Sequence, residues 1–194
     1  YYFSAAYLAD DGIIENSGFE RISSRINVDY QAKKWLKFGV NLSYANVKSR
    51  YPGDQDTDAA TSSGNAFFVG NFIAPIYPMY VRNAEGQIMH DANTGYRIYD
   101  YGDGESTNFT RNFMSMSNPM SSFLYDTEEY LMDILNGKWY AKVDILDGLS
   151  LTASLGLHVD NTRLHIVGNK YYGQSASQNG SVQQYSSRTY SLDQ

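Results

Sequence analysis

The segment that decides the fold runs from Phe19 to Arg50 and reads FERISSRINVDYQAKKWLKFGVNLSYANVKSR. In its second half, apolar side chains occupy every other position from Leu36 to Tyr44, and polar or small residues fill the positions between them. The first half alternates in a similar way from Arg21 to Tyr30. A period of two residues is typical of a strand with two different faces. The segment therefore predicts an antiparallel hairpin whose turn lies at Gln31 to Trp35.

The polar face of this hairpin is long and charged. Both alternating runs exceed the five or six residues of a typical globular strand, and their polar positions include Arg21, Arg25, Asp29 and Lys37. A membrane β-barrel with a watery interior presents such residues to its lumen. We therefore expect these four side chains to face the lumen, where they contact water or a plug.

The alternation recurs elsewhere in the chain. It predicts a first strand over Tyr1 to Leu8, strands over Tyr130 to Ile145 and Leu149 to Val159, and a last strand over Val182 to Gln194. Asp-Gly pairs at residues 11–12 and 147–148 indicate turns. In bacterial barrels short turns are periplasmic and long loops are extracellular. The predicted fold class is all-β, an antiparallel transmembrane β-barrel segment of about six strands with long extracellular loops.

Six strands are too few to close a barrel, since the smallest membrane barrels have about eight. An open edge in lipid would leave backbone groups without hydrogen bonds. The chain also starts at Tyr1, without an initiator Met or a leader, and its ends fall inside apparent strands. We therefore expect residues 1–194 to be part of a larger barrel, with any signal peptide removed or outside this sequence.

Two stretches without alternation are expected to be external loops, residues 51–126 and 164–180. The first is rich in Pro, Gly, Asp and Ser but also in aromatic residues. Loops longer than about 12–15 residues are commonly functional, and aromatic rings can stack on a sugar or pack on a partner. The alternative is that the loop packs on itself. The candidate contacts for substrate or partner are Phe67, Phe68, Phe72, Tyr77, Tyr80, Tyr96, Tyr99 and Tyr101.

The overall composition excludes several classes of protein. No run of about 18 apolar residues could form a transmembrane helix, although a barrel strand needs only alternate apolar residues. Tyr (18) and Phe (9) are abundant, as in barrels with aromatic girdles, whereas Cys is absent and disulfides with it. The net charge of −6 argues against a nucleic-acid partner. Trp35 and Trp139 are read as anchors at the membrane interface.

Few residues suggest a metal site or an enzyme. Asp54, Asp56 and Asp58 have the spacing that begins a calcium loop, but the Gly and Glu that complete it are missing. Loop-bound calcium is a weak candidate beside a solvated acidic loop, and no other cofactor is predicted. The three histidines show no metal-ligand spacing, and no nucleophile or carboxylate constellation is present. We predict no enzymatic activity.

The residues resemble one known family. Tyr2 to Ala45, YFSAAYLADDGIIENSGFERISSRINVDYQAKKWLKFGVNLSYA, is similar to the opening barrel strands of SusC/RagA-like TonB-dependent outer-membrane transporters. Asn118-Pro119, the strand ending in Lys142-Val143-Asp144, and ILDGLSLTASLGL from Ile145 are similar to the next hairpin. The resemblance covers most strands but not the loops.

The resemblance implies a part in nutrient uptake. The whole protein would be a barrel of about 22 strands with a plug domain, located in the outer membrane of a Gram-negative bacterium. It would import a glycan or peptide with a SusD/RagB-like lipoprotein as partner, and the TonB complex would act through the plug region, which this sequence lacks. The remaining alternatives are another outer-membrane barrel, such as a porin or an autotransporter, and a soluble secreted β-sandwich that binds carbohydrate.

Overall fold

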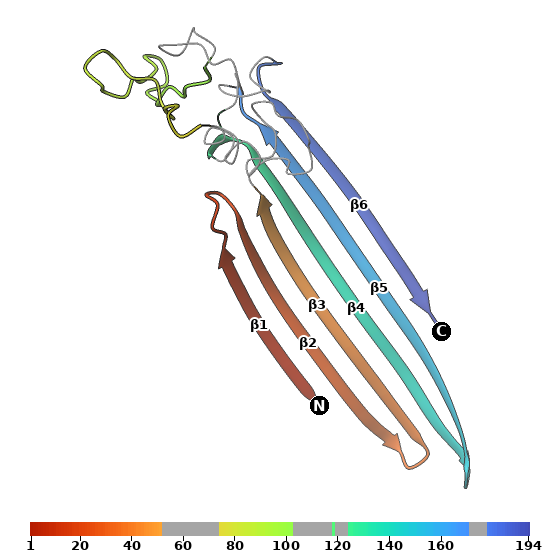
Figure 1. Cartoon of the computed structure of the whole chain (residues 1–194). Helices are drawn as coiled ribbons and strands as arrows, with labels where there is room; N and C mark the ends of the chain where they lie inside the picture. Colours follow the sequence, from red (N-terminus) through yellow and green to blue (C-terminus); the bar gives the residue numbers. More distant parts are fainter. Residues whose placement is uncertain (52–73, 103–117, 119–123, 171–177) are drawn as a thin grey trace.

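The fold is one antiparallel sheet of long strands. The computed structural model describes residues 1–51, 74–102, 118, 124–170 and 178–194. Within them, six strands are hydrogen-bonded side by side in the order of the sequence. Figure 1 shows this curved, unclosed sheet with β1 and β6 at its edges. The strands are β1 (Tyr2–Asp11), β2 (Gly18–Lys33), β3 (Leu36–Tyr51), β4 (Thr127–Leu146), β5 (Leu149–Gly168) and β6 (Ser181–Asp193).

The predicted central hairpin is confirmed. β2 and β3 pair from Gly18 and Arg50 down to Lys33 and Leu36, so the turn consists of Lys34 and Trp35. It is shorter than the predicted turn from Gln31 to Trp35, because β2 continues through Lys33. The turn between β4 and β5 is equally short and contains Asp147 and Gly148, whose φ of 83° suits glycine. Both turns lie at one end of the sheet, which we call the turn end (Figure 1). The connection from Tyr51 to Thr127 leaves from the opposite end, the loop end.

Two further predicted boundaries are wrong. β1 continues through Asp11, so the Asp-Gly pair does not centre the turn; residues 12–17 form it, with the Gly12 amide donating to the Ser17 carbonyl at 3.0 Å. β5 extends to Gly168, so residues 164–168 belong to a strand and not to a loop. The prediction stopped early because the apolar positions change face along β5, and a change of face looks like the end of alternation.

The sheet has two faces that the strand register defines. Residues paired directly across two antiparallel strands lie on the same face. One face, which includes Leu42, Trp139 and Leu155, carries a band of apolar residues and is called the band face. The other, called the opposite face, includes Asp29 and Tyr140. Both faces are largely open, since side chains such as Leu151 are 60% exposed and few residues of the sheet are fully buried. In the described part of the chain, no helix is long and apolar enough to span a membrane.

Candidate functional site

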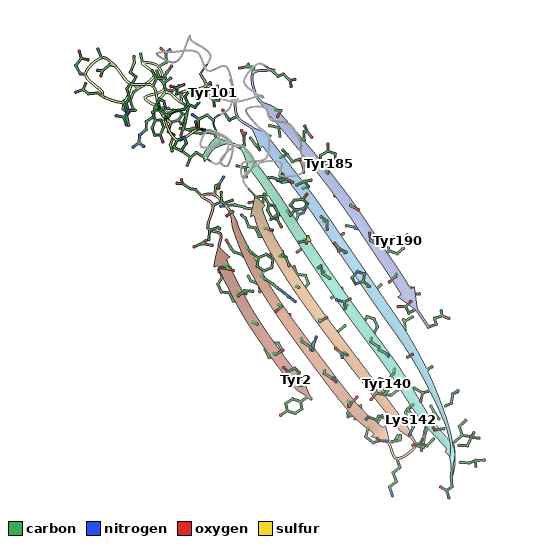
Figure 2. All side chains as sticks on the ribbon, in the orientation of Figure 1. Tyr2, Tyr101, Tyr140, Lys142, Tyr185 and Tyr190 are labelled. Carbon is green, nitrogen blue, oxygen red and sulfur yellow. The ribbon has the colours of Figure 1, made fainter. Side chains whose placement is uncertain are left out.

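The opposite face is polar at the turn end of the sheet. Lys37 Nζ lies 3.5 Å from Asp29 Oδ2 and 5.9 Å from the centre of the Tyr140 ring. The Tyr140 hydroxyl on β4 donates to the Asp29 carboxylate on β2, across β3. On β4, Lys142 Nζ lies 3.2 Å from Asp144 Oδ1. Figure 2 shows Tyr140 and Lys142 together near the turn end. These side chains make a charged, hydrogen-bonded surface.

Gly39 allows this surface to close around Tyr140. The two residues are direct partners in the β3–β4 pairing, and a Cβ at position 39 would overlap the Tyr140 ring. The ring therefore covers the backbone of the glycine, and its hydroxyl reaches Asp29 on β2. A glycine inside a strand often marks such a close approach.

Arg21 and Arg25 lie on the same face, farther from the turn end. Together with Ser4, Ser23 and Ser43 they line a hollow of about 310 Å³. The hydrogen bonds and ion pairs of the described residues do not include either guanidinium. The four predicted lumen-facing residues thus share one face, where Asp29 and Lys37 form an ion pair.

Toward the loop end the opposite face becomes apolar. Val47 is 6% exposed, and Tyr51 packs edge-on against Tyr130 with ring centres 5.8 Å apart. Leu164 and Ile166 of β5 continue this surface, since they pair with Tyr130 and Glu128. The inner lining of a barrel with this sheet would therefore change from charged to apolar along its height.

The band face changes in the reverse direction. From Leu36 to Tyr44 the β3 positions on this face are apolar, whereas Asn46, Lys48 and Arg50 continue the same series. Lys48 Nζ and Arg50 Nε lie 2.9 and 3.0 Å from Glu129 Oε2. Prediction from sequence missed this polar region of the band face, although the replacement of apolar by polar residues at even positions of β3 could have revealed it.

A polar contact holds the strand ends together at the loop end. Asp126, just before β4, accepts hydrogen bonds at Oδ1 from the Asn169 backbone amide at 2.8 Å and side-chain amide at 2.6 Å. The Asn16 side chain donates to the Asp126 carbonyl at 3.3 Å. Asn16 has a φ of 63°, a left-handed conformation that asparagine tolerates in turns. Three separate connections are thereby joined at one residue.

The described part of the long loop, residues 74–102, folds on itself. The Val81 amide donates to Ile98 at 3.0 Å, Ile98 to Met89 at 3.0 Å, and Met89 to Val81 at 2.9 Å. Asn118 donates its side-chain amide to the carbonyls of Met79 at 2.9 Å and Asp100 at 3.0 Å. These bonds make a small folded unit beyond the loop end of the sheet (Figure 2).

The predicted aromatic contacts fall into two groups. Tyr99 and Tyr101 are buried, and Tyr99 packs against Tyr80 and Tyr125 at ring-centre distances of 5.0 and 5.9 Å. Tyr96 is 44% exposed, and Tyr77 and Tyr80 are half-buried. Phe67, Phe68 and Phe72 lie outside the described residues. Substrate contact by any of these rings stays a prediction, and Tyr96 is the most exposed of those described.

Burial and hydrogen bonds shift two titrating groups in this unit. Burial, together with the neighbouring Tyr125 and Tyr80, raises the pKa of the Tyr99 hydroxyl far above its ordinary range. Backbone amides of Thr94 and Asn93 and the Thr94 hydroxyl hold the pKa of Asp91 below its ordinary value of 3.8. Tyr99 therefore stays neutral and Asp91 stays charged at neutral pH.

The calcium prediction is not tested, because Asp54, Asp56 and Asp58 lie outside the described residues. Within the described ranges, no group of three or more His, Asp or Glu side chains could hold a metal ion. His158 Nδ1 lies 2.6 Å from Asn136 Oδ1 on the opposite face. Trp139 does not lie near a strand end, as predicted, because its ring lies over Gly137 in the interior of β4, among the apolar positions of the band face. Its role as an interface anchor stays a prediction.

Long antiparallel strands with one apolar and one charged face are typical of the wall of a transmembrane β-barrel. No protein-family model matches the chain. It is 26% identical over 164 residues to the TonB-dependent receptor P3 of Formosa agariphila, covering 84% of this chain. It is 28% identical over 200 residues to the TonB-dependent receptor SusC of Bacteroides thetaiotaomicron, covering 95% of this chain. Over most of its length, therefore, the chain is similar to a segment of SusC-like TonB-dependent receptors.

The similarity concerns only part of each relative. The chain spans 14% of the length of the Formosa receptor and 18% of the length of SusC. The names of the two relatives confirm the resemblance to SusC-like TonB-dependent receptors that the sequence indicated, and the all-β sheet of six strands agrees with it.

Proposed function

We propose that this chain is part of the barrel wall of an outer-membrane, TonB-dependent importer of oligomeric nutrients. The observation that carries the proposal is the height of the apolar band. On β4 the band runs from Leu135 to Ile145, ten residue steps. At about 3.3 Å per residue and a tilt of 35–45°, that length crosses about 25 Å, the height of the apolar belt of outer-membrane barrels.

The opposite face supplies what a transport lumen needs. At the level of the band it carries Asp29, Lys37 and Lys142, which lipid would not accept but water or a polar plug would. The two faces thus differ at the same height. A soluble β-sandwich would bury its apolar face against a second sheet, and in the described residues none of the strands forms such a layer.

In the whole protein, we place this segment in a barrel of about 22 strands around a plug. The TonB complex acts through the plug, and a SusD-like lipoprotein binds at the loop end. The substrate is a glycan or a peptide, and the folded unit at residues 74–102 lies where it could contact the substrate or the lipoprotein. The proposal assigns this segment no covalent chemistry.

The test uses the full-length protein in its own cell. First, the intact mass and the partition between membrane and soluble fractions are measured. A polypeptide several times larger than 21.9 kDa in the outer-membrane fraction is expected. A soluble species of about this mass would contradict the proposal and favour the sandwich.

Next, uptake of labelled glycan and peptide mixtures is compared between wild-type and gene-deletion cells, with and without a protonophore. An importer of this class loses uptake in both the deletion and the de-energised cells. Uptake that survives the protonophore would indicate a porin instead. Co-purification of a lipoprotein with the tagged receptor tests the proposed partner separately.

A further inference from the structure

The band face carries a polar hollow at the level where its apolar band ends. Its volume is about 580 Å³, and five side chains from β4, β5 and β6 line it, Asp133, Asn161, Arg163, Ser186 and Arg188. The register places all of them on the band face, since Asn161 pairs with Asp133 and Arg188. One step nearer the turn end on this face lie Leu135, Val159 and Tyr190. The hollow therefore borders the apolar band directly.

Asp133, the one acidic side chain that lines the hollow, already has partners for its carboxylate. Asp133 Oδ1 accepts hydrogen bonds from the Tyr44 hydroxyl at 2.7 Å and the Asn46 amide at 2.8 Å. Its Oδ2 lies 3.2 Å from Arg163 Nη2. With both oxygens engaged by donors on β3 and β5, Asp133 orients Arg163 and has little capacity left to bind a further cation.

The two guanidinium groups retain donors that point to no acceptor in the hollow. Arg188 uses Nε to donate to Asn161 Oδ1 at 2.5 Å, which leaves its terminal amino groups. Arg163 uses one contact to Asp133, and its side chain is 48% exposed. The guanidinium groups of Arg163 and Arg188 are planar, and side chains of the same sheet hold them in place. They suit the oxygens of a phosphate group, which arginine binds in a bidentate manner.

We propose that this hollow binds the phosphate head group of a membrane lipid, with the acyl chains lying along the band below it. The proposal rests on the membrane placement made under the proposed function. A lipid fits better than free phosphate because the adjoining surface is apolar and open: Tyr190 is 75% and Leu192 60% exposed. Figure 2 shows Tyr190 on β6, farther toward the turn end than Tyr185. Arginine and lysine side chains near a membrane surface attract anionic lipid head groups.

The experiment uses the full-length receptor, purified and delipidated in a neutral detergent. Binding of phosphatidylglycerol, phosphatidylcholine and inorganic phosphate is measured by native mass spectrometry and titration. The test variant is Arg163→Gln with Arg188→Gln. We expect it to weaken phosphatidylglycerol binding roughly thirtyfold, because each basic side chain near an anionic surface contributes about a fivefold factor.

The matched control is Arg21→Gln with Arg25→Gln. It removes the same charge from the same barrel wall but on the opposite face, so phosphatidylglycerol binding should stay unchanged. Arg163→Lys with Arg188→Lys keeps the charge and loses the fork geometry, so it should fall between wild type and the glutamine variant. Heat-modifiable migration on gels checks that each variant is folded.

Equal effects of the two glutamine variants, or no effect of either, would overturn the proposal. Inorganic phosphate binding as tightly as the lipid would also overturn it, since the apolar surface would then contribute nothing. Failure here leaves the proposed function standing if energised uptake persists in the same cells. A soluble wild-type protein would instead contradict the proposed function itself, whatever the lipid titration gives.

Discussion

On the band face of the sheet, the two halves of β3 differ in polarity. Toward the turn end, the band face of this strand carries Leu36, Phe38, Val40 and Leu42. Toward the loop end, the same face carries Lys48 and Arg50, which pair with Glu129. The opposite face reverses this order, from Lys37 near the turn to the buried Val47. The change occurs at the same level in β4 and β5, at Asp133 and Asn161.

This difference shows that the apolar band is shorter than the strands that carry it. β4 and β5 each have 20 residues, about 66 Å when extended, yet the apolar band needs only about half of that. In the proposed membrane placement, the loop-end half of the sheet lies outside the hydrocarbon, with water or head groups on its outer side. Its inner side can then be apolar, because loops or ligands can cover it.

The largest expected effect comes from a charge placed within the band. Leu155→Arg puts a guanidinium beside Trp139 at mid-band and should destabilise the folded barrel by about 2–4 kcal/mol. The same charge on the same strand and face at Asn161, in the loop-end half, should cost far less. Leu151 and Leu157 should behave like Leu155. The measurement is urea unfolding of the full-length protein in lipid vesicles.

The face control for this series is Ser154→Arg, which puts the charge on the opposite face next to Leu155. Arg at Thr152 should be similarly mild. If Ser154→Arg and Leu155→Arg were equally costly, the sheet would have two buried faces and the membrane interpretation would be wrong. If Asn161→Arg were as costly as Leu155→Arg, the band would extend farther than the register indicates.

A smaller effect is expected where the opposite face packs at the turn end. Gly39→Ala places a methyl group into the Tyr140 ring and forces that ring from its bond with Asp29, at a cost of about 2 kcal/mol. Gly156→Ala is the matched control, because its Cβ would meet only ordinary contacts 3.5 Å and more away on Asp193. Chemical denaturation compares the two. Equal stability of both variants would mean that Tyr140 moves aside freely.

Much of the fold could be predicted from alternation alone. The hairpin around Lys34 and Trp35 and the six strands follow from apolar residues at every second position, because a strand with two environments requires that period. Where the apolar surface passes from one face of the sheet to the other, the apolar residues shift by one position in the sequence. At Leu164 and Ile166 the apolar residues lie on the other face, so a true strand looked like the start of a loop.

The site was less predictable, because its contacts join distant parts of the chain. The face of Arg21, Arg25, Asp29 and Lys37 follows from their positions in β2 and β3. The contact of Asp29 with Tyr140 does not, since the two are 111 residues apart and meet only through the β3–β4 register. Similarly, the hollow at Arg163 and Arg188 needs the pairing of three strands. The tyrosines of residues 74–102 show no strand period, so the burial of Tyr99 had no sequence signal.

The ion pairs in the loop-end and turn-end halves of the sheet should also differ in how much they stabilise the protein. Glu129 has a side chain only 18% exposed and binds both Lys48 and Arg50, so Glu129→Gln should cost about 1.5 kcal/mol. Asp144→Asn removes an exposed pair with Lys142 near the turn and should cost about 0.5 kcal/mol or less. Raising the salt concentration should reduce the second effect further. A larger loss for Asp144→Asn would reverse the order of the two halves.

The smallest effect concerns the folded unit beyond the sheet, which local hydrogen bonds hold together. Asp91 Oδ1 accepts bonds from the amides of Thr94 at 2.8 Å and Asn93 at 2.9 Å, and from the Thr94 hydroxyl at 3.0 Å. These donors lower the pKa of Asp91 below 3.8. The charged form therefore stabilises the turn above that pH, and the stabilisation is lost as the pH falls through the lowered pKa.

Hydrogen exchange of the Asn93 and Thr94 amides in the full-length protein tests this turn. Exchange relative to the intrinsic rate should quicken only below pH 3.8, and Asp91→Asn should give faster exchange already at neutral pH. The amides of Val47 and Trp139 in the sheet should show no change in either case, because none of the hydrogen bonds among the described residues joins the turn to the interior of those strands. If strand protection fell together with that of the turn, the loop unit and the sheet would form one cooperative body, and the separation between membrane wall and external structure would not extend to the loop.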